Sequence, residues 1–513
     1  MNTSTATETA TTNQAARNIG PGDEPVPPRM GKSAVLALLT AELPADIVLH
    51  ADEDLRPFEC DGLSAYRQLP MIAVLPTTIE QVQTVLRVCS THQVPVVARG
   101  AGTGLSAGAL PLDNGVLLSL ARFNRILDID RANRRATVQP GVRNLAISEA
   151  VDHLGLYYAP DPSSQIACSI GGNVAENSGG VHCLKYGLTT HNILQIEIVT
   201  IDGERLTLGS HALDTPGFDL LALMTGSEGL LGVIVEVTVK LLPQPELARV
   251  AMICFDDVRA AGNAVAAIIQ AGIVPAGLEM LDNPAIVATE AFVHAGYPTD
   301  AEAILLCEVD GTQAEVEEDM ERVREVVERG GATDVRISRD AAERALFWAG
   351  RKAAFPAMGR ISPDYYCMDG TIPRKALAEV LIGIGELSKR YGQRVANVFH
   401  AGDGNLHPLI LYDANKPGEF EATEAFGGAI CQLCLEHGGT ITGEHGVGME
   451  KIDQMCLQFP PAELTQFHAV KAAFDPGTLL NPGKAVPTLH RCAEFGAMHV
   501  HNGELPFPEL ERL

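Results

Sequence analysis

Residues 96–111, VVARGAGTGLSAGALP, place a glycine-rich turn directly after a β-branched run that predicts a strand. Glycines let successive backbone N–H groups approach and bind a phosphate. The turn contains Gly102-x-Gly104-x-x-Ala107, which imitates the dinucleotide fingerprint of Rossmann folds. That fingerprint must open a helix, and the residues GALPLDNG that follow cannot start one. The stretch therefore predicts either an anion-binding turn outside the Rossmann fold or a purely structural turn.

Three further glycine turns favour the anion-binding interpretation. Residues 161–180, DPSSQIACSIGGNVAENSGG, predict a second loop suited to a pyrophosphate. Residues 186–193 and 224–237 add two turns, each before a predicted strand. Short apolar runs alternate with helical periodicity around them: residues 70–76 predict a strand, and residues 77–92 predict a helix with a threonine cap. The pattern predicts an α+β unit with many strands.

The pattern restarts near residue 246. A strand, a helix and another strand in residues 246–281 recur in residues 301–338, which predicts a second α+β domain with an antiparallel sheet. We therefore expect a disordered tail over 1–32, a first domain over 33–245, a second domain over 246–440, a segment returning to the first domain over 441–486, and a C-terminal tail over 487–513.

The bulk composition limits the classes of function. The chain has 513 residues, a net charge of −26 and a pI near 4.9, which disfavours nucleic acids and anionic membrane surfaces as partners. Its 11 cysteines, with only Cys431 and Cys434 close together, favour free thiols in a reducing compartment. No apolar run reaches the ~18 residues of a membrane span, and the N-terminus lacks the apolar core of a signal peptide. We predict a cytoplasmic protein that reaches the inner membrane only through partners.

Two histidines flank a tight turn in residues 397–410, NVFHAGDGNLHPLI. The glycines, Asp and Asn between His400 and His407 argue against a helix, so we expect a hairpin that sets the two side chains across from each other. Glu444 follows in another glycine-flanked loop. Two histidines and a carboxylate form a catalytic metal set that leaves positions for substrate, and Zn, Mn and Fe all accept it. From spacing alone, packed histidines remain an equal alternative.

The order of the glycine turns resembles flavoproteins of the vanillyl-alcohol-oxidase type, whose FAD-binding domain has two α+β subdomains. Some members attach FAD covalently through a histidine in the first loop; the matching place near Thr103 has none, so we expect non-covalent FAD. The resemblance assigns FAD contacts to Arg99, Gly100, Ala101, Gly102, Thr103, Gly104, Leu105, Ser106, Ser169, Gly171, Gly172, Asn177, Gly179, Gly180, Glu228, Gly232, Ile234 and Asn481.

The stretch HAGDGNLHP with the later GEHGVG resembles the C-terminal domain of FAD-linked 2-hydroxy-acid dehydrogenases. That resemblance implies a divalent metal bound by His400, His407 and Glu444, with His445 as the catalytic base. It also makes residues 246–440 the substrate domain.

Residues 348–377 and the tail 480–512 further resemble the FAD subunits of bacterial glycolate oxidases. The resemblance implies metal-assisted hydride transfer to FAD from a small 2-hydroxy acid, glycolate or D-lactate, giving the 2-oxo acid. It also implies electron transfer to a second FAD-binding-like subunit and an iron–sulfur subunit. The C-terminal tail is a candidate docking segment.

We expect Arg351 to bind the substrate carboxylate, because the planar guanidinium group matches a carboxylate. We expect Lys352 to be exposed to solvent. Where hydroxyglutarate enzymes hold a second carboxylate, this sequence has Phe355, Cys367 and Leu409, so the resemblance favours a small substrate. Two other functions compete. A metal-dependent hydrolase leaves the glycine turns unexplained, and a non-catalytic FAD scaffold leaves the metal set unexplained.

Overall fold

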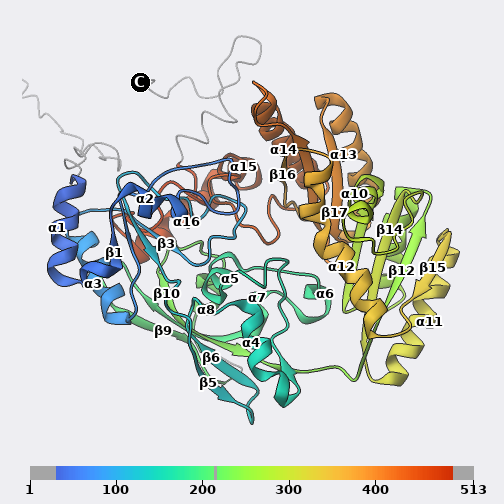
Figure 1. Ribbon diagram of the computed structural model, residues 1–513, viewed down its shortest axis with the longest axis horizontal. Coiled ribbons are helices and arrows are strands. Elements are labelled where there is room, and N and C mark those ends of the chain that lie inside the picture. The colour runs from blue at the N-terminus through green and yellow to red at the C-terminus, as the bar shows by residue number, and fades with distance from the viewer. Residues whose placement is uncertain (1–29, 213–215, 489–513) are drawn as a thin grey trace, which may run out of the picture.

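The computed structural model describes residues 30–212 and 216–488. The predicted tails lie almost wholly outside these ranges, so both remain predictions. Figure 1 shows two bodies: the sheets of the N-terminal half lie on one side and a larger sheet lies on the other, with α5, α6 and α7 between them. The predicted boundaries at 245 and 440 also remain predictions, although the larger sheet begins at Leu247.

The first sheet has four strands in the order β1-β2-β4-β3. β2, β4 and β3 run parallel to one another, with β2 and β3 joined through helix α3. The predicted helix after β2 is α3, where Thr78 accepts the N–H of Gln81 and forms a capping box with it. The elements are β1 (Val48–Leu49), β2 (Ile72–Val74), α3 (Ile79–Thr91), β3 (Val96–Arg99) and β4 (Val116–Ser119), preceded by α1 (Lys32–Glu42) and α2 (Asp52–Leu55).

The second sheet is antiparallel, with five strands in the order β5-β6-β10-β8-β9. It confirms the many-stranded α+β unit. Its elements are β5 (Ile126–Asp130), β6 (Arg135–Val138), α4 (Asn144–Val151), β8 (Ile193–Val199), β9 (Arg205–Gly209), α8 (Leu220–Met224) and β10 (Val233–Lys240), with a small separate pair β7 (Leu156–Tyr157) and β11 (Leu242–Pro243).

The predicted loop over 161–180 is partly wrong, because it contains helix α5 (Ile170–Glu176). Two glycines near a helix start lower its intrinsic stability. Tertiary packing outweighs that cost here: a Cβ on Gly171 would stand 2.5 Å from Cβ of Pro140, so only glycine fits this close approach. Asn177, in the left-handed region, ends the helix. Two short helices follow, α6 (Cys183–Tyr186) and α7 (Thr189–Asn192).

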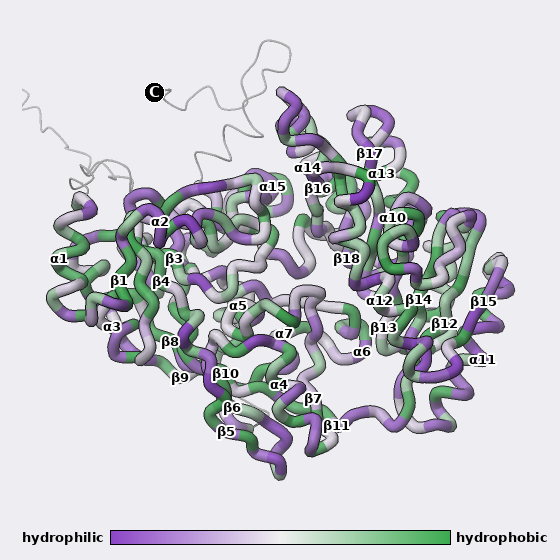
Figure 2. The backbone as a smooth tube through the Cα atoms, in the orientation of Figure 1, coloured by the Kyte–Doolittle hydropathy of each residue, from purple (hydrophilic) through white to green (hydrophobic). Residues whose placement is uncertain are grey.

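The third sheet confirms the predicted antiparallel α+β unit. Its seven strands run in the order β15-β12-β14-β13-β17-β18-β16. Figure 2 shows hydrophobic residues along these strands and mixed colours along the outer helix α11. The strands are β12 (Leu247–Phe255), β13 (Gly277–Asp282), β14 (Ala303–Gly311), β15 (Asp334–Ile337), β16 (Asp364–Cys367), β17 (Arg394–His400) and β18 (Asn405–Tyr412).

Helices cover both faces of this sheet, as side-chain alternation along the strands requires. Ile253 and Phe255 pack into the core beneath α9, α11, α13 and α14, whereas Met252 and Cys254 pack beneath α10 and α12. The helices are α9 (Val258–Gln270), α10 (Asn283–Val293), α11 (Gln313–Arg329), α12 (Ala341–Ala357), α13 (Leu377–Tyr391) and α14 (Glu419–Glu436). Cys431 and Cys434 are buried free thiols in α14.

The C-terminal segment returns to the first sheet. It carries α15 (Ile452–Gln458) and α16 (Pro461–Phe474), and Leu480 then forms a parallel bridge with Val96 of β3. Figure 1 shows these red elements beside the blue N-terminal ones. Among the described residues, none of the helices combines the length and the apolar character needed to cross a membrane.

Candidate active site

The hairpin β17–β18 carries both predicted metal histidines, but not directly opposite each other. Asn405 pairs with His400, and Val398 pairs with His407. That part of the prediction is wrong, because periodicity shows which face a residue takes but not the register of its partner. The two rings are diagonal neighbours on the face beneath α12. Their centroids are 4.9 Å apart at 81°, so both side chains reach one point.

Glu444 completes a compact donor set at that point. Its Oε1 lies 3.4 Å from Nε2 of His400 and 3.2 Å from Nε2 of His407. Neither nitrogen has a hydrogen-bond partner among the described residues. Burial alone would raise the pKa of Glu444, but the two imidazoles hold it well below its usual value. Buried, unpartnered nitrogens around a carboxylate fit a divalent metal at the ~2.0–2.2 Å that such ligands need.

Asp369, two residues after β16, holds the loop that presents Glu444. Its carboxylate accepts the N–H groups of Gly443, at 3.1 Å, and His445, at 2.9 Å. It also accepts the hydroxyl of Thr442 at 2.5 Å. Asp369 lies near His407 and His445, but its oxygens are already engaged by this nest of donors. We therefore regard it as the organiser of the loop.

His445 stacks on His407, with centroids 4.8 Å apart and planes 3° from parallel. Its Nε2 is 3.8 Å from Oε1 of Glu444, and its Nδ1 has no hydrogen-bond partner in the described part of the chain. Burial lowers the pKa of His445 to about 4, although Asp369 opposes that shift. The imidazole is therefore neutral at neutral pH and able to accept a proton.

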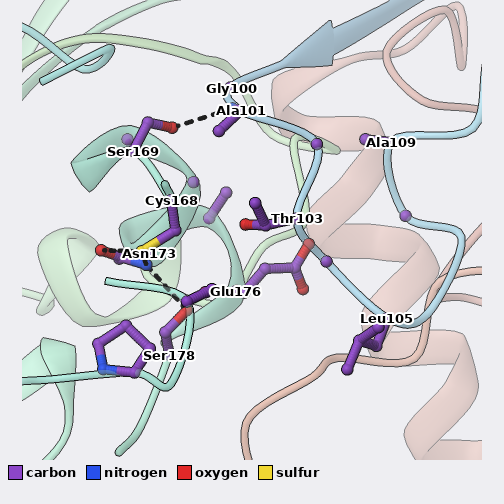
Figure 3. Close-up of a pocket in the computed structure, with 18 of the residues that line it drawn as sticks. Gly100, Ala101, Thr103, Leu105, Ala109, Cys168, Ser169, Asn173, Glu176 and Ser178 are labelled. Carbon is purple, nitrogen blue, oxygen red and sulfur yellow. Dashed lines mark hydrogen bonds between the residues drawn. The ribbon is translucent and has the colours of Figure 1, made fainter. Parts of the chain in front are cut away.

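One cavity joins the glycine turns to this cluster. It measures about 390 Å³, within the range of small-molecule sites. Figure 3 shows the turn over 100–109 facing α5 across it, with the Oγ of Ser169 accepting the N–H of Ala101 at 3.3 Å. His407, Glu444 and His445 line the same cavity. Two groups of residues that the sequence treats separately thus form one site.

Most of the predicted FAD residues line the cavity directly. A Cβ built on Gly104 would meet no atom within 4 Å, so open space lies against this backbone, as a dinucleotide requires. The lining residues are Arg99, Gly100, Ala101, Gly102, Thr103, Gly104, Leu105, Ser169, Gly171, Gly172, Glu228, Gly232 and Ile234.

Five predicted residues lie outside that lining: Ser106, Asn177, Gly179, Gly180 and Asn481. Asn481 donates to the carbonyls of Gly108, at 3.0 Å, and Glu228, at 2.8 Å, so it holds the turn without facing the cavity. Gly179 lies against Glu444, because a Cβ at this position would stand 2.7 Å from Oε2 of that carboxylate.

Several charged residues were missed by sequence reasoning. Glu176 lines the cavity, and its Oε2 is buried without a hydrogen-bond partner in the described structure. Burial and the nearby Glu228 raise its pKa. Lys484 donates to the carbonyls of Gly108 and Leu110, and burial lowers its pKa to about 7. The sequence did not predict Glu176 and Lys484 as site residues, because glycine-turn patterns predict contacts of the backbone and not of side chains.

Of the residues predicted at the substrate end, some line the cavity and others do not. Arg351 is 1% exposed, and its Nε donates to Glu279 at 2.7 Å. Lys352 is exposed, as predicted, and also lines the cavity with Phe355. The Phe355 ring lies edge-on to His407 at 6.2 Å. Cys367 and Leu409 are a buried cross-strand pair outside the lining.

Sequence comparison identifies the family. A model of the C-terminal domain of FAD linked oxidases matches residues 244–485, and an FAD binding domain model matches residues 70–209. The chain belongs to the FAD-linked oxidases. It is an FAD-dependent oxidoreductase. This oxidase is 68% identical to the glycolate oxidase subunit GlcD of Escherichia coli K12, covering 94% of this chain and 97% of that protein.

More distant relatives share the same extent. The oxidase is 39% identical to subunit GlcD of Bacillus subtilis, covering 83% of this chain and 91% of that one. It is 34% identical to a D-lactate dehydrogenase of Anaerostipes hadrus, covering 85% and 94%. Among solved structures, p-cresol methylhydroxylase superposes with a TM-score of 0.74 at 17% identity over 89% of this chain and 97% of that one. The fold predicted from vanillyl-alcohol-oxidase-type proteins, with its antiparallel sheet, is confirmed.

Proposed function

We propose that the protein oxidises a small 2-hydroxy acid, glycolate or D-lactate, to the 2-oxo acid. The observation that carries the proposal is the shared cavity: the FAD turns and the cluster of His407, Glu444 and His445 line the same space. The names of the relatives, a glycolate oxidase subunit and a D-lactate dehydrogenase, support this substrate class. Non-covalent FAD supplies the two-electron acceptor, and a divalent metal, Zn, Mn or Fe, supplies a Lewis acid.

His400, His407 and Glu444 are the proposed metal ligands. Their converging atoms lie within 4.8 Å of one another, and three protein ligands leave positions for a substrate carboxylate and its α-hydroxyl. His445 is the proposed general base. Its buried Nδ1 has no partner in the described part of the chain, so it is able to receive the hydroxyl proton.

Positive charge near the cavity and bulk within it support a small anionic substrate. A chain with a net charge of −26 needs local positive groups to hold a carboxylate. Lys352 lines the cavity. We propose Arg351 as the carboxylate contact, because its buried Nη2 has no hydrogen-bond partner within the described residues, although its side chain lies outside the cavity lining. Phe355 occupies space beside His407 and favours substrates of two or three carbons.

Electrons then leave through partners. We propose a second FAD-binding-like subunit and an iron–sulfur subunit, because the E. coli and B. subtilis relatives are named as subunits of glycolate oxidase. A cytoplasmic location, with any membrane contact made by those partners, completes the proposal.

Anaerobic spectroscopy tests the function. The purified protein should show flavin absorption that bleaches with glycolate or D-lactate and not with 2-hydroxyglutarate. A protein without flavin absorption would favour the hydrolase alternative. A flavin that neither acid reduces, even with partner subunits present, would favour the scaffold alternative.

A further inference from the structure

Glu279, on β13, joins two groups that the proposed function uses. The residue is 0% exposed. Its Oε2 accepts Nε–H of Arg351 at 2.7 Å, and its Oε1 lies 2.8 Å from Nδ1 of His400. Both carboxylate oxygens are therefore engaged, one on each side.

The sheet register brings these groups together. β13 pairs with β17 through Met280↔Phe399 and Leu281↔Val398, so the next pair in that register is Glu279 with His400. Cross-strand partners share a face, and α12 carries Arg351 over that face. The contact is thus built by three separate elements and not by one flexible loop.

We propose that Glu279 is a positioning residue that sets the metal ligand and the substrate cation at once. By accepting Nδ1–H of His400 it fixes the tautomer and directs the Nε2 lone pair towards Glu444 and His407. By holding Nε of Arg351 it fixes the plane of the guanidinium and leaves Nη2 available. This inference rests on the metal site of the proposed function.

A glutamine at this position would break the arrangement with little change in volume. Its amide offers one acceptor oxygen, whereas His400 and Arg351 each present a donor. One donor then faces an NH₂ group, and a buried unpaired donor is costly. Carboxylates behind metal-binding histidines typically change metal affinity about 10–100-fold when removed.

The chain offers a matched control on the neighbouring strand. Glu308 on β14 is 1% exposed. It accepts from Arg344 at 2.6 and 2.8 Å and lies 3.3 Å from Nε2 of His182. Glu308→Gln therefore removes an equally buried carboxylate from an arginine, a histidine and the indole of Trp348, none of which is a proposed metal ligand or substrate contact.

The experiment titrates metal-depleted, FAD-loaded protein with Zn²⁺ against a chromophoric chelator. Zn²⁺ affinity should fall about 10–100-fold in Glu279→Gln and stay at the wild-type value in Glu308→Gln. Glu279→Asp, which keeps the charge but shortens the reach, should also bind more weakly. The KM for glycolate should rise in Glu279→Gln, because Arg351 loses its alignment.

Four outcomes would overturn the inference. Wild-type Zn²⁺ affinity in a folded, FAD-loaded Glu279→Gln protein contradicts positioning. Equal losses in both glutamine variants would mark a general stability effect, and failure of both Glu279 variants to fold would mark Glu279 as a folding residue. If His400→Ala binds Zn²⁺ as tightly as the wild-type protein, the proposed metal site itself is contradicted, and the inference falls with it.

Discussion

The seven-stranded sheet places a glutamate between an arginine and a histidine twice. In the first triad, Glu279 contacts Arg351 and His400; in the second, Glu308 contacts Arg344 and His182 and also accepts the indole N–H of Trp348. The two glutamates occupy adjacent strands, and both arginines come from α12, seven residues or about two turns apart. Nearly identical chemistry therefore serves two positions on one face of the sheet.

The difference lies in the second nitrogen of each histidine. Nδ1 of His182 lies 2.8 Å from Asp161, so both of its ring nitrogens face carboxylates. Nε2 of His400 also lies near a carboxylate, 3.4 Å from Oε1 of Glu444, but it makes no hydrogen bond in the described structure and shares that oxygen with Nε2 of His407 at 3.2 Å. Two imidazole nitrogens that converge on one carboxylate can bind a metal, whereas His182, hydrogen-bonded at both nitrogens, connects α6 and its neighbours to the sheet. The group that the second ring nitrogen faces, more than the triad itself, therefore decides what each histidine does.

The largest expected effect lies at His445, beside the first triad. His445→Ala should slow flavin reduction by glycolate about 10²–10⁴-fold, because it removes the proposed proton acceptor. FAD content and Zn²⁺ binding should stay near wild type. Stopped-flow anaerobic reduction measures the rate. Rapid reduction in the variant would remove His445 from the role of base.

The second triad should matter for stability and not for metal. Glu308→Gln takes the charged acceptor away from Arg344, whose side chain is 33% exposed, and from the Trp348 indole, which costs about 1–3 kcal/mol of unfolding free energy. Denaturant unfolding of the FAD-loaded protein measures the loss. A variant as stable as wild type would show that the triad does not hold the two bodies together.

The charge on His182 should contribute a smaller, pH-dependent part of the free energy of unfolding. Burial would lower its pKa, but Asp161 and Glu308 raise the pKa of His182 to about 10. Because the folded pKa exceeds the unfolded value of about 6.5, the stabilisation is complete below that pH and is lost as pH rises through about 10. The difference in unfolding free energy between wild type and His182→Gln should therefore be larger at about pH 6 than at about pH 9.5. An equal or opposite difference would exclude a charged His182.

The smallest effect concerns substrate size. Phe355→Ala removes the ring beside His407, so longer 2-hydroxy acids should gain about tenfold in kcat/KM relative to glycolate. Competition between 2-hydroxybutyrate and glycolate measures the ratio. An unchanged ratio would show that another wall limits the cavity.

Local patterns predicted much of the fold and little of the charge network. The Thr78 cap, the β17–β18 hairpin and the antiparallel sheet follow from neighbours in sequence. Helix α5 was missed because its glycines argue against a helix until Pro140 packs on them. Glu279 and His400 are 121 residues apart, and only the strand register brings them together.

The central claim is that the FAD cavity and the His400–His407–Glu444 cluster form one catalytic site. Chelator-treated, FAD-loaded protein tests it most directly when mixed anaerobically with glycolate. We predict that flavin absorption persists but no longer bleaches, and that added Zn²⁺, Mn²⁺ or Fe²⁺ restores bleaching. Full reduction by glycolate in metal-free protein would contradict the claim.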